Sequence, residues 1–254
     1  MAVPGESAEF DFTKATTPTK FYVVCSTPRS GSTLLTRALW RCGRMGAPHE
    51  YFNLQTVLFR MQMRFQCDSI YKYTDEVMRL RTGPNGVFAV KLHQEHWHTF
   101  WYCGRFILFK GLKYIRIRRR DRLAQAVSLT IARQTGQWTH DVPAKAEAKY
   151  DFHMLRRALY DLDIQERGWD AMFAERKVKP LDLVYEDFRN DLDGCVAEVC
   201  RFVGVDPDAP AEPLAIPELE RQSTADNKAW AQRFQQDMVR WRKIQARQAQ
   251  RPSA

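Results

Sequence analysis

The chain has 254 residues and a formal net charge of +9, from 39 Lys and Arg against 30 Asp and Glu. With 44% hydrophobic residues it can bury one substantial core. It holds no uncharged apolar run of about 18 residues, which argues against a membrane-spanning helix. The basic excess is typical of proteins that meet nucleic acid, an anionic membrane surface or a small polyanion.

The cysteines and the first residues bear on location. The six Cys form neither a CxxC motif nor a disulfide scaffold, which favours a reducing compartment. The first ten residues contain acids and lack the basic stretch and apolar core of a secretory signal. We therefore expect a cytoplasmic protein. Residues 1–19 are polar with two Pro, so we expect a flexible N-terminal arm before a single domain over residues 20–254.

A polar turn follows the first predicted strand, residues 21–26, and leads into a predicted helix. The turn reads Arg29-Ser30-Gly31-Ser32-Thr33. A strand, a tight turn and a helix start direct several backbone N–H groups at one point, where the helix dipole favours an anion. Gly31 allows a phosphate to approach the backbone, and Arg29 adds a fork of donors. The simpler interpretation is an ordinary helix capped by Ser or Thr.

The same turn lacks the motifs of two common nucleotide sites. In the phosphate-binding loop of nucleotide triphosphatases, the last Gly is followed by Lys and then by Ser or Thr. Here Ser32 follows Gly31, and the next Lys in the sequence is Lys72. A dinucleotide-binding turn has three Gly, whereas residues 25–33 have one. The sequence thus disfavours kinase chemistry and indicates a nucleotide phosphate held without a metal ion.

A second basic cluster follows a strand predicted over residues 113–118. This strand alternates apolar and basic residues, which is typical of a strand with one buried face. A helix is predicted to begin near Asp121, so Arg120 ends the strand and Ser128 lies about two turns into the helix. Arg120 and Ser128 can then hold a second phosphate from two sides. Five Arg among residues 116–122 equally fit a solvated edge or a nucleic-acid surface.

The remaining elements complete an α/β pattern. Further strands are predicted over residues 87–92 and 181–185, and helices from residue 151, over 192–203 and over about 226–247. Such alternation predicts a central parallel sheet flanked by helices. Lys91 ends the strand over 87–92, where open sheets bind ligands, although a salt bridge would also explain it. No Cys lies at ligand spacing from the nearby His residues, so a zinc site is not expected.

Taken together, STPRSGSTLL at residues 26–35 and RRDRLAQAVSL at 119–129 resemble the two cofactor signatures of sulfotransferases that use 3′-phosphoadenosine 5′-phosphosulfate (PAPS). More narrowly, the chain resembles the bacterial trehalose 2-sulfotransferase-like branch of glycan and lipopolysaccharide sulfotransferases. Further matching segments are residues 48–52, 88–93, 133–138, 184–188 and 220–230.

The resemblance implies a P-loop-like sulfotransferase fold and an enzyme that moves a sulfuryl group from PAPS to a hydroxyl, with 3′-phosphoadenosine 5′-phosphate (PAP) as product. The acceptor would be a carbohydrate or glycolipid, such as a trehalose-like or lipopolysaccharide sugar. The residues expected to hold the 5′-phosphosulfate are Arg29, Ser30, Gly31, Ser32 and Thr33, and those expected at the 3′-phosphate are Arg120 and Ser128.

The resemblance also implies catalytic roles. Glu50 matches the general base, Arg29 would stabilise charge on the leaving phosphate, and Arg221 and Gln222 would lie near the cofactor. His93 is the alternative base, and His49 departs from the family pattern, which leaves its role open.

Other functions remain open from the residues alone. A P-loop-like nucleotide kinase is disfavoured by the missing Lys and magnesium-binding acids, and a non-catalytic nucleotide- or nucleic-acid-binding protein would use residues 116–122. Nucleic acid is not an expected partner, because no zinc finger or helix-turn-helix motif occurs. Peripheral membrane contact, a homodimer and the identity of the acceptor stay open.

Overall fold

The computed structural model describes residues 5–14, 16–102, 111–139, 142–214, 216 and 225–249. Its contacts divide the chain into two compact units, Met1–Arg120 with Gln165–Glu218, and Asp121–Ile164 with Leu219–Ala254. The sequence led us to expect one domain over residues 20–254, and whether the two units act as one domain stays a prediction.

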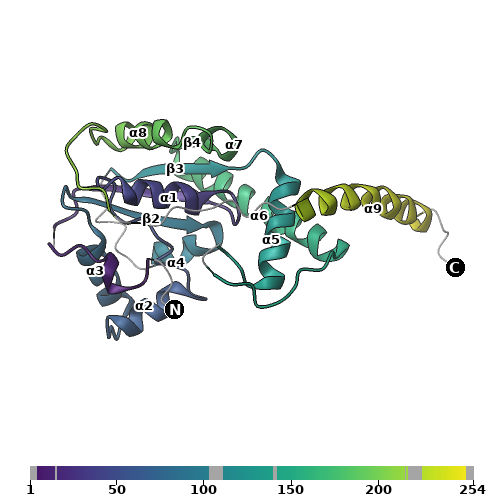
Figure 1. Ribbon diagram of the computed structural model, residues 1–254, viewed down its shortest axis with the longest axis horizontal. Coiled ribbons are helices and arrows are strands. Elements are labelled where there is room, and N and C mark those ends of the chain that lie inside the picture. The colour runs from purple at the N-terminus through teal and green to yellow at the C-terminus, as the bar shows by residue number, and fades with distance from the viewer. Residues whose placement is uncertain are drawn as a thin grey trace. The chain divides into compact units, whose positions relative to one another are not determined.

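A four-stranded sheet forms the centre of the first unit, with strand order β2-β1-β3-β4. Strands β2, β3 and β4 are labelled in Figure 1. The strands are β1 (Lys20–Ser26), β2 (Val87–His93), β3 (Lys113–Arg118) and β4 (Leu181–Val184). All three neighbouring pairs are parallel, which confirms the predicted α/β class with a central parallel sheet. The carboxyl ends of the strands therefore share one edge, and the loop after β1 lies where open parallel sheets bind ligands.

Helices cover both faces of this sheet. Alternate residues of β1 enter two different cores, with Val23 and Cys25 in one and Tyr22 and Val24 in the other. The first core is covered by α2 (Val57–Arg64), α3 (Ile70–Arg81), α4 (Trp97–Tyr102) and the end of α6 (Phe152–Arg176). The second is covered by α1 (Ser32–Arg41), α7 (Tyr185–Phe188) and α8 (Leu192–Val203). Burial on both faces explains why the central strand is an unbroken apolar run.

β3 does not follow the one-sided pattern that its sequence predicted. Residues 114–117 are all buried, and Arg116 is only 6% exposed. The Arg116 guanidinium forms ion pairs with Glu166 and Asp170 of α6. A buried guanidinium is tolerated when it is paired and hydrogen-bonded. The prediction of a single buried face was therefore wrong. The partners that allow Arg116 to be buried come from a helix distant in the sequence, which the local pattern does not reveal.

The described part of the N-terminal segment has specific partners in the first unit. It contains a 3₁₀ turn, η1 (Ala8–Phe10). Glu6 pairs with Arg60 of α2, and Asp11 pairs with Arg64 of α2 and Arg81 of α3. Arg81 has no exposed surface and also donates to two backbone carbonyls of the segment. These contacts differ from the free arm that the polar composition suggested.

The second unit is helical where it is described. It contains α5 (Arg122–Thr135), the first part of α6 and α9 (Ala225–Ala249). α5 begins next to Asp121, as the sequence predicted, and the Asp121 side chain caps it by accepting from the backbone N–H of Ala124. Gly136 ends the helix at φ 68°. Val127, Leu155 and Phe234 belong to its apolar core. Within the described ranges, no helix combines the length and apolar character needed to cross a bilayer.

Candidate active site

The turn between β1 and α1 has an unusual backbone. The N–H of Ser30 donates to the carbonyl of Thr27, with Pro28 and Arg29 at the two central positions. Arg29 has a φ of 62° and Gly31 a φ of 88°. A turn with Pro second and positive φ third is a type II turn, and its third position normally favours Gly. A non-Gly residue with this φ is uncommon, so the turn holds Arg29 in a costly conformation.

Position 31 requires glycine for two reasons, its positive φ and the close approach of a neighbouring side chain. A Cβ atom built on Gly31 would lie 2.2 Å from Cδ2 of Tyr185. Tyr185 begins α7, which follows β4 at the same sheet edge. The aromatic ring therefore packs directly on the turn, and no side chain fits between them.

The start of α1 can accept an anion. Gly31 provides no side-chain cap, so the first N–H groups of the helix keep their donors for a ligand. The hydroxyl of Ser30 is buried and has no hydrogen-bond partner among the described residues. Ser32 is also buried, whereas Thr33 is partly exposed. These donors fit a phosphate or sulfate group, which offers several acceptor oxygens.

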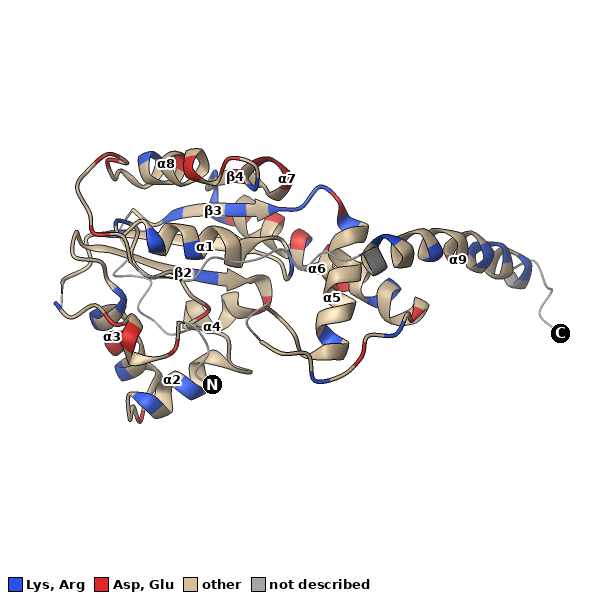
Figure 2. Cartoon of the chain, viewed as in Figure 1, with Lys and Arg blue, Asp and Glu red and all other residues tan. Residues whose placement is uncertain are grey.

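Two guanidinium groups add positive charge at this turn. Nη1 of Arg119 donates to the Arg29 carbonyl at 3.2 Å, and the Arg119 guanidinium lies 5.1 Å from the centre of the Tyr185 ring. Burial and then the charge of Arg119 lower the pKa of Arg29 to about 10. Arg29 therefore stays protonated at neutral pH. Figure 2 shows the basic residues at the carboxyl end of β3 and in the turn that follows.

Glu50 lies at the same edge of the sheet, beside the end of β2. Its Oε1 is 2.8 Å from Nζ of Lys91 and 3.3 Å from Nε2 of His93, and its Oε2 accepts from Asn53 at 2.9 Å. The backbone N–H of Lys91 also donates to the carbonyl of His49 at 2.9 Å, which fixes the chain beside Glu50. Burial raises the pKa of Glu50, but Lys91 and then His93 outweigh it and hold that pKa well below its usual range. Glu50 is therefore an ionised carboxylate at neutral pH.

Lys91 connects Glu50 to the turn. Its Nζ donates to Oγ1 of Thr33 at 3.0 Å while it pairs with Glu50, and its side chain is 4% exposed. The structure thus brings together two residues that the sequence assigned to different tasks, the predicted base and a predicted phosphate contact. The salt bridge considered for Lys91 is present, and it lies within the candidate site.

The histidines near Glu50 differ in their surroundings. Nδ1 of His93 lies 3.0 Å from Oγ of Ser26, and Nε2 faces Glu50. Because a carboxylate only accepts, Nε2 must carry a proton to hydrogen-bond there. Burial and then His93 lower the pKa of His96 to about 3, and burial and then Lys91 lower that of His49 to about 3. His49 and His96 are therefore neutral at physiological pH, which disfavours a proton-carrying role for either.

The sequence matches the model of a protein family described as "Stf0 sulphotransferase". The match covers residues 21–101 and 107–237, which is most of the chain. The chain belongs to the Stf0 sulphotransferase family. It is 29% identical to a trehalose 2-sulfotransferase of Mycobacterium tuberculosis (strain ATCC 35801 / TMC 107 / Erdman) and 27% identical to one of Mycolicibacterium smegmatis (strain ATCC 700084 / mc(2)155). Each alignment covers 86% of this chain and 96% of the relative.

Solved sulfotransferase structures show a more distant likeness. The sulfotransferase from Alicyclobacillus acidocaldarius is 16% identical, with a TM-score of 0.48, over 90% of this chain and 96% of that one. Membership of the Stf0 family makes the chain an enzyme, a sulfotransferase. The nucleotide kinase and the non-catalytic binding protein are therefore not supported.

The second predicted contact of this sulfotransferase is less enclosed. The Arg120 side chain is 63% exposed and pairs with Asp187 at 2.8 Å, while its backbone N–H donates to Glu186. Ser128 lies on α5 in the second unit, so the shared phosphate site of Arg120 and Ser128 stays a prediction. Arg221 and Gln222 lie outside the described residues.

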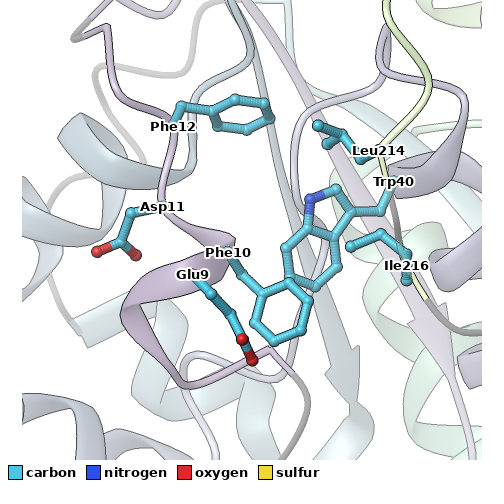
Figure 3. Close-up of a pocket in the computed structure, with 7 residues that line it drawn as sticks. All are labelled: Glu9, Phe10, Asp11, Phe12, Trp40, Leu214 and Ile216. Atoms are coloured by element: carbon cyan, nitrogen blue, oxygen red, sulfur yellow. The ribbon is translucent and has the colours of Figure 1, made fainter.

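A cavity of about 340 Å³ lies apart from these residues (Figure 3). Phe10, Phe12 and Trp40 line it, and Trp40 is near the end of α1 that is opposite the turn. None of the predicted site residues borders it. Among the described residues, no group of three or more His, Cys, Asp or Glu is placed to hold a metal ion.

The sequence did not predict several parts of this candidate site. In the structure, the candidate site also contains Asn53, Arg119 and Tyr185. Lys91 lies between the predicted base, Glu50, and the predicted phosphate contact, Thr33. Lys91 carried the strongest signal, because a Lys at the carboxyl end of a buried strand must have a partner. Asn53 carried no local signal of a site, and Tyr185 was noted only as part of the matching segment 184–188.

Proposed function

We propose that this enzyme transfers the sulfuryl group of PAPS to a hydroxyl of a carbohydrate or glycolipid acceptor. The observation that carries the proposal is the contact of Lys91 with both Glu50 and Thr33, which joins a buried carboxylate to an uncapped helix start. The donor, when bound, supplies the activated sulfuryl group and leaves as PAP. No resident metal is part of this proposal.

The residues of the turn would hold the 5′ end of the donor. The orphaned hydroxyl of Ser30, the hydroxyls of Ser32 and Thr33 and the first N–H groups of α1 fit a phosphosulfate. Arg29, held by its strained backbone, would stabilise the negative charge that the leaving phosphate gains. Arg120 and Ser128 would hold the 3′-phosphate, and Arg221 and Gln222 would lie nearby.

Glu50 would take the proton of the acceptor hydroxyl. Its carboxylate is ionised and is oriented by Asn53, Lys91 and His93, so it has unprotonated oxygens that can take the proton. The cations that keep it ionised also lower its basicity. General-base catalysis by such a group is worth roughly 10²–10⁴-fold in rate. His93 is the alternative base, since its ring lies beside Glu50 at the same candidate site.

The acceptor is proposed from the relatives. Two relatives named trehalose 2-sulfotransferases make trehalose the first acceptor to test, with glycolipid and lipopolysaccharide sugars next. We further propose that the enzyme acts in the cytoplasm, where a glycolipid acceptor would require contact with a membrane surface. A homodimer is compatible with this function but is not needed for it.

Ligand-induced stabilisation tests the donor assignment. PAP at about 100 times its dissociation constant should stabilise the folded protein by about 2.7 kcal/mol, whereas ATP with Mg²⁺ should not. A thermal shift assay measures both, and labelled PAPS then tests trehalose, glycolipid and lipopolysaccharide fragments as acceptors. A protein stabilised by ATP with Mg²⁺ and not by PAP would refute the proposed function.

A further inference from the structure

Two side chains of α6 form hydrogen bonds with Ser26 and Thr27, where β1 ends and the turn that we propose to bind the donor begins. Oγ1 of Thr27 donates to Oε1 of Glu166 at 3.3 Å, and Nε1 of Trp169 donates to the carbonyl of Ser26 at 2.9 Å. Residues 166 and 169 lie three apart and therefore share one face of the helix. Thr27 and Trp169 are almost completely buried, so the Trp169 contact lies away from solvent and the Glu166 contact is partly buried.

Thr27 is the first residue of the strained turn. Its carbonyl accepts from the N–H of Ser30, which closes the turn around Arg29 at its positive φ. Such a conformation persists only where the surroundings fix it. The hydroxyl of Thr27 and the carbonyl of Ser26 are two of the atoms through which the surroundings do so.

Glu166 is itself held by the buried guanidinium of β3. Nη2 of Arg116 lies 2.9 Å from Oε2 of Glu166, and Nη1 lies 2.5 Å from Oδ1 of Asp170. Glu166 is 15% exposed, whereas Asp170 is 61% exposed. A lone carboxylate next to an anion site would repel the ligand, and Arg116 compensates that charge. One carboxylate oxygen therefore pairs with Arg116 while the other stays directed at Thr27.

We propose that Glu166 is a positioning residue for the donor, which acts through Thr27 to keep the turn over residues 27–31 in its anion-binding shape. The proposal rests on the proposed function, because it takes this turn to be the site of the donor phosphosulfate. Glu166 does not contact the ligand in this proposal. Asp170 shares Arg116 but has no described contact with the turn, and it therefore provides a matched control.

Four variants and one ligand test the proposal. PAP affinity is measured by calorimetry on the folded full chain for wild type, Glu166→Ala, Glu166→Gln, Thr27→Val and Asp170→Ala. We expect Glu166→Ala and Thr27→Val to weaken PAP roughly tenfold each, the cost of losing one hydrogen bond to a charged group. Glu166→Gln keeps an acceptor for Thr27 and should retain most of the affinity. Asp170→Ala should lower the melting temperature without changing PAP affinity.

The double variant Thr27→Val/Glu166→Ala separates positioning from general damage. If the two residues act through one contact, the double variant binds PAP as weakly as either single variant. Additive losses, or unchanged affinity in Thr27→Val, would overturn the proposal. Thr27→Val is nearly isosteric, so it decides the matter even if Glu166→Ala does not fold. If wild type does not bind PAP at all, the proposed function fails instead.

Discussion

Thr33 and Arg120 are both predicted to contact phosphate groups of one ligand, yet their surroundings differ sharply. Thr33 accepts a hydrogen bond from buried Lys91 at the start of α1, near Gly31, which packs against Tyr185. Trp169 of α6 donates to Ser26 at the other end of the same turn. Arg120 is 63% exposed and pairs with an equally exposed Asp187. An exposed ion pair is worth about 0–1 kcal/mol, so a phosphate can replace it easily. The turn that we propose to bind the donor therefore has its shape without a ligand, whereas Arg120 would have to leave Asp187 to bind a phosphate.

Glu50→Gln should have the largest effect on activity, because it removes the proposed base beside Lys91 and Thr33. We expect kcat to fall roughly 10²–10⁴-fold while PAP affinity changes little. Steady-state kinetics with labelled donor and PAP titration measure the two quantities. A Glu50→Gln enzyme with normal kcat would remove Glu50 as base, and His93→Gln would then be the variant to examine.

Gly31→Ala should damage the turn by two separate causes. The φ of 88° disfavours Ala, and the new Cβ would collide with the Tyr185 ring. Gly204→Ala is the control, because Gly204 has a φ of 81° and no atom lies within 4 Å of the position that its new Cβ would take. We expect about 1 kcal/mol lost in the control and clearly more in Gly31→Ala, together with at least about tenfold weaker PAP binding. Equal stability losses would mean that Tyr185 yields without cost.

Arg120→Ala tests the exposed end of the comparison. We expect roughly tenfold weaker binding of PAP and no change for adenosine 5′-phosphate, because only PAP carries the 3′-phosphate. Stability should hardly change, since the lost ion pair is exposed. Competition binding with the two nucleotides measures the ratio. Equal losses for both would contradict the assignment of Arg120 to the 3′-phosphate.

The pH dependence of stability should show the smallest effect. The pKa of Glu50 is lower in the folded chain than in the unfolded one, where it lies near about 4.3. Its pairing with Lys91 and His93 therefore stabilises the fold above that pH and is lost as the pH falls through the folded pKa. The stability gap between wild type and Glu50→Gln, from urea unfolding, should narrow on acidification. A gap that stays constant from neutral to acid pH would show that Glu50 is not charge-paired.

The sequence predicted the sheet well because its signals are local. Strands β1, β2 and β3 are short runs of mostly buried residues, and the predicted bounds of all four strands agree with the structure to within one or two positions. The same holds for the start of α5 at its Asp121 cap and for the end of α8 at Gly204. Caps and apolar runs act within a few residues, so they can be recognised without knowledge of the fold.

The contacts around the candidate site could not be predicted in this way. Arg116 resembled the exposed half of an alternating strand until Glu166 and Asp170 were seen beside it. The polar composition predicted a flexible N-terminal arm, whereas Glu6 and Asp11 of this segment pair with Arg60, Arg64 and Arg81. In each case the partner is a side chain from another element. The sequence around neither member of the ion pair indicates that the two residues meet.

The amino-acid sequence by itself determined the strand-turn-helix around Gly31, the parallel sheet and the family, because backbone preferences and motifs are written in consecutive residues. Only the tertiary structure decided that Lys91 joins Glu50 to Thr33 and that Glu166 supports Thr27. Hydrogen bonds and ion pairs need atoms within about 3 Å, and only the packing of separate elements brings them that close.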